Sequence, residues 1–138
     1  MLLGMDLSTH GIVALVRNAE GKFLLLKDAR PQMKDHWAPP HGRCESTDKS
    51  EEAGVIREVY EETKLTVTPI KNILTQPADT KVKTVSFWVV DCRADQDVVL
   101  DEESSAYGWY SVDKALDLLL YPGTKLLFEK LKSGQMNL

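Results

Sequence analysis

The sequence has little of what would indicate a secreted, membrane-spanning or nucleic-acid-coating protein. Its two cysteines, Cys44 and Cys92, are too few for a disulfide-held scaffold, which favours two reduced thiols, buried or half-buried. No apolar run is long enough to span a bilayer, and the N-terminus lacks the basic start of a signal peptide. With 21 acidic against 17 basic side chains, the net charge of -4 provides no overall positive field for a nucleic-acid backbone. We therefore expect a soluble, cytoplasmic protein without a membrane partner.

What the chain does contain fits one α/β domain over residues 1–138, since there is no internal repeat, low-complexity segment or linker. Short apolar runs at residues 12–16 and 23–26 flank a group of turn formers, which predicts a β-hairpin. Residues 28–43 hold three of the six prolines and predict an irregular surface loop.

The second half of the chain predicts alternating strands and helices. Ser50 is expected to cap a helix that runs to about Thr63. The other predicted elements are strands at residues 65–74, 81–92 and 107–110, a helix after Ser111 that Pro122-Gly123 breaks, and a last helix at 124–132 closed by Gly134. Strands with interspersed helices predict a layered sandwich.

The run Arg57-Glu58-Val59-Tyr60-Glu61-Glu62 is the most informative segment. Residues three and four apart share a helix face, which places three carboxylates side by side: Glu58, Glu61 and Glu62. The opposite side carries Ala53, Ile56 and Tyr60. An acidic run is usually a solvated face, but like charges at this spacing repel, so a cation is expected beside them. Hard oxygen donors on one rigid helix suit Mg²⁺, with Mn²⁺ as the other candidate.

The turn before this helix strengthens the metal interpretation. Gly42, which ends a Pro-Pro-His-Gly sequence, can bring its backbone carbonyl close to the same cation. Arg57 can orient a neighbouring carboxylate through two hydrogen bonds.

Residues 42–65 resemble the Nudix box, which runs Gly, five residues, Glu, seven residues, then Arg-Glu-aliphatic-any-Glu-Glu-any-Gly-aliphatic. The second half matches from Arg57 through Glu62. Three departures stand out. The box glutamate is replaced by Asp48 or Lys49, depending on the direction of counting; the loop carries one extra residue; and Lys64 stands where the family has glycine. A left-handed residue at this last position would be strained.

The resemblance implies an α/β/α sandwich with a central mixed β-sheet and a metal-dependent enzyme that splits pyrophosphate links in nucleotides. Beyond the box, the chain is most similar to the asymmetric diadenosine tetraphosphate hydrolases of this family. The similar segments are His36-Trp37-Ala38-Pro39-Pro40-His41-Gly42, residues 81–88, Leu100-Asp101-Glu102-Glu103 and Tyr107-Gly108-Trp109. The similarity implies that Glu103 is a late metal-binding or base carboxylate and that Tyr121 stacks on adenine.

Local groups must supply the positive charge that a polyphosphate needs, because the protein is acidic overall. The candidate phosphate contacts are His36, His41, Arg43, Lys81 and Lys83. Phe87 and Tyr121 are the candidates for stacking on a base, although aromatic residues at such positions more often belong to the core.

The expected reaction is hydrolysis by a water that the bound metal makes more acidic, with Glu58 or Glu103 as the base; the sequence does not choose between them. Diadenosine tetraphosphate is the first substrate candidate. The alternatives are a nucleoside triphosphate pyrophosphohydrolase that cleans the nucleotide pool, an enzyme acting on an RNA 5′ end, and a nucleotide-binding module without catalysis. No obligate protein partner is evident.

Overall fold

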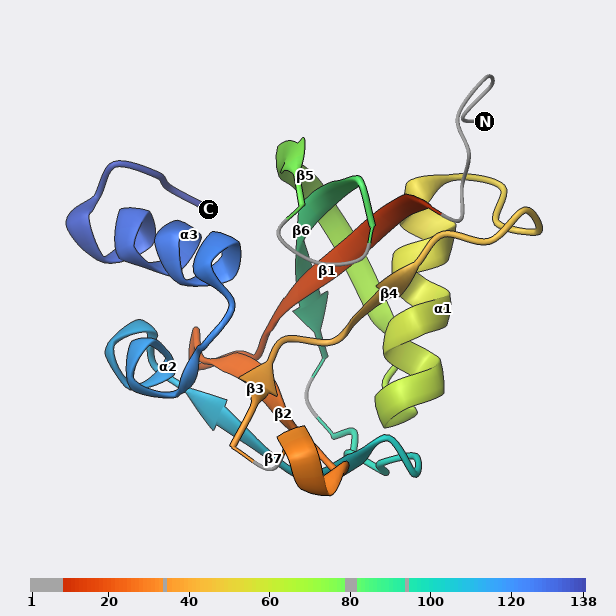
Figure 1. Cartoon of the computed structure of the whole chain (residues 1–138), viewed down its shortest axis with the longest axis horizontal. Helices are drawn as coiled ribbons and strands as arrows, with labels where there is room; N and C mark the ends of the chain where they lie inside the picture. Colours follow the sequence, from red (N-terminus) through yellow and green to blue (C-terminus); the bar gives the residue numbers. More distant parts are fainter. Residues whose placement is uncertain (1–8, 34, 79–81, 94) are drawn as a thin grey trace.

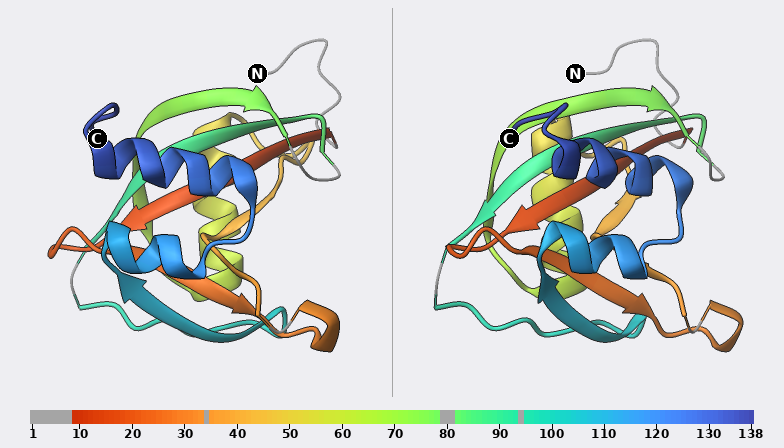
Figure 2. Two further views of the ribbon diagram at one scale, coloured as in Figure 1. Left: turned by 60° about the vertical axis from the view of Figure 1, so that its left-hand side comes forward. Right: turned by 90° about the vertical axis from the view of Figure 1, so that its left-hand side faces the viewer.

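The computed structural model describes residues 9–33, 35–78, 82–93 and 95–138. A mixed β-sheet separates helix α1 (Glu51–Thr63) on one face from α2 (Val112–Leu118) and α3 (Pro122–Ser133) on the other (Figure 1). Helices α2 and α3 lie together over their face of the sheet (Figure 2). The predicted α/β/α sandwich with a mixed central sheet is therefore confirmed. None of the helices in the described ranges is long and apolar enough to cross a membrane.

The sheet has seven strands, ordered β3-β2-β1-β6-β5, with β4 also paired to β1 and β7 to β2. They are β1 (His10–Arg17), β2 (Phe23–Asp28), β3 (Trp37–Ala38), β4 (His41–Arg43), β5 (Val67–Pro77), β6 (Thr84–Cys92) and β7 (Ser104–Tyr110). Only the β1–β6 pairing is parallel among these neighbours; the others are antiparallel. Because β1 and β6 are central, helices cover both of their faces.

Two hydrophobic clusters lie on opposite faces of the sheet, because successive strand residues point to opposite sides. The cluster under α1 contains Ile12, Ala14, Val16, Trp88, Val55 and Val59. The cluster under α2 and α3 contains Leu15, Phe23, Leu25, Phe87, Leu127 and Phe128. The core thus fixes α1 relative to β1, the strand that also carries β4.

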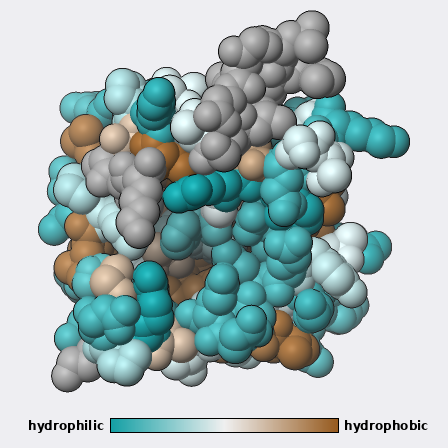
Figure 3. All heavy atoms as spheres, turned by 45° about the vertical axis from the view of Figure 1, so that its right-hand side comes forward, coloured by the Kyte–Doolittle hydropathy of each residue, from teal (hydrophilic) through white to brown (hydrophobic). Residues whose placement is uncertain are grey.

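One side of α1 faces solvent and the other faces the core. Ile56 and Tyr60, predicted to lie opposite the carboxylates, are 39% and 50% exposed, whereas Val55, Val59 and Glu62 are buried. The carboxylate face therefore points partly into the protein, and the other side faces solvent. Figure 3 shows a predominantly hydrophilic surface with scattered hydrophobic residues on the face of the molecule that carries α1.

The predicted hairpin is confirmed: Arg17 pairs with Phe23, and Gly21 adopts a positive φ of 76° in the turn. The prediction of an irregular loop over residues 28–43 is wrong in part. This segment forms a short 3-10 helix at Pro31–Met33 and then pairs first with β2, through β3, and next with β1, through β4. Its backbone groups find partners because β1 and β2 diverge after their turn and leave free edges between them.

Other boundaries also differ from the prediction. Strand β7 begins at Ser104, three residues earlier than expected, because β2 pairs with it along its whole length. Ser111 caps α2 as predicted, but α2 already ends at Leu118. Pro122 does not break that helix; it begins α3, where a proline N–H would have no partner in any case. Gly134 closes α3 with a φ of 78°, as predicted.

Both cysteines are free thiols, with Cys44 buried and Cys92 half-buried, as predicted. Burial raises the pKa of the Cys44 thiol to about 11 and raises that of Cys92 as well. Both thiols are therefore protonated at neutral pH and are poor nucleophiles.

Helix α1 ends at Lys64 in the left-handed conformation that the sequence suggested for this position, with φ of 62°. Its N–H donates to the Tyr60 carbonyl at 2.8 Å, and its ammonium group lies 5.1 Å from the centre of the Tyr60 ring. The backbone conformation costs roughly 1–2 kcal/mol for a residue with a Cβ, and an exposed cation–π contact recovers about 0.5 kcal/mol.

Replacing Lys64 by Gly should therefore stabilise the protein by about 0.5–1 kcal/mol, a rise in melting temperature of roughly 3 °C. Lys64→Ala is the control, since it keeps the strain and loses the ring contact; it should lower the melting temperature slightly. Scanning calorimetry measures both. An unchanged or lower melting temperature for Lys64→Gly would contradict the strain argument.

Candidate active site

Arg57 ties the loop before α1 to the helix. Its guanidinium donates to both oxygens of Asp48, from Nε at 2.9 Å and from Nη2 at 3.0 Å, and from Nη2 to the Arg43 carbonyl at 3.0 Å. Nη1 donates to Glu58 at 2.9 Å and to Glu61 at 3.1 Å. These contacts raise the pKa of Arg57, mainly through Asp48, and hold the pKa of Asp48 below its ordinary value. Arg57 thus holds Glu58 and Glu61 relative to the loop, the arrangement expected of a residue that orients neighbouring carboxylates.

The position of Asp48 decides which residue replaces the box glutamate. Asp48, counted forward from Gly42, holds Arg57, whereas Lys49 is exposed. Asp48 also accepts a hydrogen bond from the Glu45 N–H at 2.8 Å, which closes the loop on itself. Ser50 then caps α1 by accepting from the Ala53 N–H at 3.1 Å. Counted in this way, the extra residue lies between Asp48 and Arg57.

Glu58 packs against the backbone of Gly42. A Cβ at Gly42 would overlap the Glu58 carboxyl group, so the absence of a side chain, rather than an unusual φ, explains the glycine. Burial raises the pKa of Glu58 to about 7, against the lowering effect of Arg57. The β1–β4 pairing, in which Gly42 lies opposite Ile12, fixes this contact between β4 and α1.

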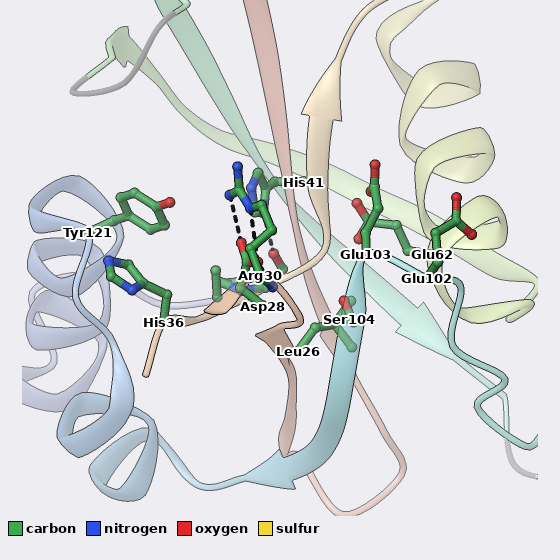
Figure 4. Close-up of a pocket in the computed structure, with 12 residues that line it drawn as sticks. Leu26, Asp28, Arg30, His36, His41, Glu62, Glu102, Glu103, Ser104 and Tyr121 are labelled. Carbon is green, nitrogen blue, oxygen red and sulfur yellow. Dashed lines mark hydrogen bonds and ion pairs between the residues drawn. The ribbon is translucent and has the colours of Figure 1, made fainter. Parts of the chain in front are cut away.

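Glu62 is buried, 8% exposed, and Glu103 lies next to it (Figure 4). Burial, followed by the charges of Glu58, Glu103 and Asp101, raises the pKa of Glu62 to about 9. The segment before β7 lies against the end of α1, since Val99 donates to the Thr63 carbonyl at 2.9 Å and Asp101 to the Glu62 carbonyl at 3.4 Å. These bonds satisfy carbonyls that a helix end leaves without partners. They also bring Glu103 to the carboxylates of α1.

These acidic groups fit a hard divalent cation in donor type and charge. Glu62 is buried and Glu58 is half-buried, and desolvation together with the neighbouring carboxylates raises the pKa of both. Glu61 is 54% exposed and hydrogen-bonded to Arg57. Within the described part of the chain, no three His, Cys, Asp or Glu side chains are already arranged around a single metal position. The donors are therefore neighbours rather than a closed cage.

A pocket of about 370 Å³ lies beside this acidic cluster. Figure 4 shows Glu62 and Glu103 on one side of it and His36 and Tyr121 on the other. The His36 and His41 rings lie 6.1 and 6.3 Å from the Tyr121 ring, between centroids. His41 donates from Nδ1 to the Pro39 carbonyl at 2.9 Å, while the buried Nδ1 of His36 has no hydrogen-bond partner in the described structure. One pocket thus connects an acidic side with an aromatic side.

The structure brings together only part of the residue set predicted from sequence. His36, His41, Glu62, Glu103 and Tyr121 line the pocket. Four other predicted residues lie on β4 and α1 and are not part of the pocket lining: Gly42, Arg57, Glu58 and Glu61.

The proposed base contact by Phe87 is wrong. Phe87 is 2% exposed and packs in the core under α2 and α3, because β6 is covered on both faces. Arg43 and Lys83 are exposed but do not line the pocket, and Lys81 lies outside the described residues.

Asp28 and Arg30 line the pocket but were missed in the sequence analysis. The available signal was an Asp-any-Arg sequence directly after the apolar run of β2, where a strand end commonly carries functional side chains. This signal lies within residues 28–43, for which the sequence predicts only an irregular loop.

Gly42→Ala should displace the Glu58 carboxyl group. We expect kcat to fall at least tenfold and the melting temperature to drop by several degrees, because the methyl group and the carboxylate cannot occupy the same space. Gly134→Ala is a control for stability alone, since it strains a positive φ at the far end of α3. An active Gly42→Ala enzyme would show that Glu58 can function elsewhere. Steady-state kinetics and thermal melts measure both variants.

Known proteins share this fold. The model of the NUDIX domain family matches residues 8–131. A MutT protein from Methanosarcina mazei Go1 is 30% identical over 94% of this chain and 96% of that chain, with a TM-score of 0.73. A C. elegans Ap4A hydrolase is 25% identical over 93% and 98%, with a TM-score of 0.67. None of the curated proteins matches the sequence.

The family match covers the sheet, α1, α2 and most of α3, and it includes Arg57 and the carboxylates of α1. A solved relative with 30% identity shares the fold over nearly its whole length. The chain belongs to the Nudix family and is a pyrophosphohydrolase of that family.

Proposed function

We propose that this protein hydrolyses a phosphoanhydride bond of a dinucleoside polyphosphate, such as diadenosine tetraphosphate. The observation that carries the proposal is the connection, within one pocket, between an acidic side at Glu62 and Glu103 and an aromatic side at His36 and Tyr121. A nucleotide needs both: a ring to cover its base and a metal site for its phosphates. The resemblance to diadenosine tetraphosphate hydrolases supports this substrate class.

Mg²⁺, or Mn²⁺ in its place, is the proposed cofactor. The residues that would hold it are Glu58, Glu61, Glu62 and the carbonyl of Gly42, whereas Glu103, the further carboxylate on this side of the pocket, is assigned below to the base. When bound, the cation neutralises phosphate charge and makes a water more acidic. Arg57 keeps Glu58 oriented toward β4, and the packing of Glu58 on Gly42 keeps that carboxylate on the metal side of α1.

Glu103 is the better candidate for the base that takes the proton of the attacking water. It is exposed and lines the pocket, so solvent and substrate can both reach it. Glu58 is held by Arg57 and does not line the pocket, although its pKa of about 7 would suit proton transfer at neutral pH. We therefore assign Glu58 to the metal and Glu103 to the water.

The aromatic side would bind the base. Tyr121 offers a half-buried ring, with His36 and His41 at its edges, which matches the stacking role proposed for it. His41 bonds to the Pro39 carbonyl through Nδ1, which leaves its Nε2 atom available to a phosphate.

A nucleoside triphosphate pyrophosphohydrolase is the second candidate, which the 30% identity to a MutT protein favours. Both candidates need the same acidic side and differ in what fills the aromatic side. Incubation with Mg²⁺ and a nucleotide panel, followed by product analysis, separates them. ATP plus AMP from diadenosine tetraphosphate supports the proposal; a nucleoside monophosphate plus pyrophosphate from triphosphates supports the second candidate. Binding without hydrolysis across the panel would overturn both and indicate a nucleotide-binding module.

A further inference from the structure

We propose that Arg30, held in place by Asp28, binds the phosphate chain of the substrate between the base and the bond that is cleaved. This inference rests on the proposed nucleotide substrate and adds a specificity-determining contact to it: the protein would distinguish nucleotides by the number of their phosphates.

The Asp28 carboxylate fixes the Arg30 side chain in one orientation. Arg30 donates from Nε to Oδ1 at 3.1 Å and from Nη2 to Oδ2 at 2.7 Å, and its backbone N–H donates to Oδ1 at 2.9 Å. Asp28 itself is fixed at the end of β2, because its N–H donates to the His36 carbonyl at 2.9 Å and it pairs with Ser104 of β7. A planar guanidinium held along one edge still offers its other donors to a ligand.

Arg30 is oriented for a ligand rather than for burial. Its side chain is 60% exposed, and among the described residues only Asp28 accepts hydrogen bonds from it. An exposed ion pair of this kind contributes little to stability. Stability therefore does not explain why this pair lies on the wall of the pocket.

The charge of the pocket supplies that reason. Its described lining contains four acidic residues, Asp28, Glu62, Glu102 and Glu103, and Arg30 is the single Arg or Lys side chain among them. A bound metal would offset charge only on the side of the acidic cluster. Phosphates farther from the metal would meet an acidic wall without Arg30, and a guanidinium is the side chain best matched to two phosphate oxygens.

The location of Arg30 matches the middle of a nucleotide. Figure 4 shows it between Tyr121 on the aromatic side and Glu103 on the acidic side. All three residues line the same pocket. A base at Tyr121 and a reacting phosphate at Glu103 would place the intervening phosphates beside Arg30.

Calorimetric binding of AMP and of the methylene-bridged, non-hydrolysable analogues of ADP and ATP tests the assignment, with Mg²⁺ present and the full chain used throughout. In the parent protein, affinity should rise with each added phosphate. In Arg30→Gln, that rise should shrink by about tenfold or more for the ATP analogue, with AMP much less affected, because a charge-assisted hydrogen bond is lost. Arg30→Lys should recover part of the loss, since it keeps the charge without the planar group.

Arg17→Gln is the matched control, because Arg17 forms the same kind of pair with Asp91, at 2.7 Å, away from the pocket. It should leave every affinity unchanged. Equal weakening of all three ligands by Arg30→Gln would mean that Arg30 reads the base, and no change would mean a simple surface ion pair; either result overturns the inference. Failure of the proposed function looks different: diadenosine tetraphosphate would then not be hydrolysed, whatever the affinities of these three ligands.

Discussion

Glu103→Gln is expected to lower kcat by about 10²–10⁴-fold while leaving most of the metal-induced rise in melting temperature intact. The amide cannot accept the proton of the attacking water, but Glu58 and Glu62 remain on α1 to hold the cation. Loss of a base appears in kcat, whereas loss of a metal ligand appears in the metal dependence of stability. Single-turnover kinetics at saturating Mg²⁺, together with melts at increasing Mg²⁺, measure the two effects separately.

The substitution should leave the backbone in place. The Glu103 carbonyl accepts from the Ala29 N–H at 3.0 Å, and its own N–H donates to Asp101 at 3.0 Å, so neither bond depends on the carboxylate. Glu102→Gln is the matched control: Glu102 is the adjacent residue, is exposed and also lines the pocket. It should change kcat less than about threefold. Equal losses for the two variants would indicate a general effect of charge.

The same experiment decides between the two possible bases. Near-parental turnover in Glu103→Gln would contradict the assignment and return the role to Glu58. Glu58→Gln should then lose turnover and keep the response to Mg²⁺, the opposite of what its contact with Gly42 leads us to expect. A loss of both activity and metal response in Glu103→Gln would make Glu103 a metal ligand above all.

The helical half of the site could be predicted from sequence because its information is local. A cap at Ser50, the spacing of Glu58 and Glu62, and the left-handed end at Lys64 each depend on residues within one or two turns. The sequence also limited the residue that replaces the box glutamate to Asp48 or Lys49. Only the bonds of Arg57 to Asp48 favour one of the two.

The pocket could not be predicted in the same way, because pairings between distant segments create it. Glu103 reaches the acidic cluster because the segment before β7 bonds to the end of α1, and Arg30 reaches the pocket because β2 pairs with β7. Phe87 was misplaced for a related reason: alternation in β6 suggested one open face, while layers on both sides of the sheet bury it. Periodicity identifies a strand but not what covers it.

Glu62→Gln should make the metal-free protein more stable at pH 8 and abolish its stabilisation by Mg²⁺. The ordinary pKa of this carboxyl is 4.5, and burial raises it to about 9 in the fold. Between these values the unfolded chain releases the proton and the folded chain retains it. The metal-free fold therefore loses stability as the pH rises through this range. Glutamine removes that penalty, a gain on the order of 2 kcal/mol or roughly 8 °C.

The pH dependence and the response to metal together make this result specific to Glu62. Melts in EDTA should show the gain at pH 8 and its disappearance near pH 4, where both states of the parent protein hold the proton. Glu52→Gln, an exposed change in the first turn of α1, should neither stabilise the metal-free protein at pH 8 nor reduce its stabilisation by Mg²⁺. A variant that is less stable at pH 8, or that Mg²⁺ still stabilises as strongly as the parent, would show that the buried carboxylate is retained for folding rather than for the cation.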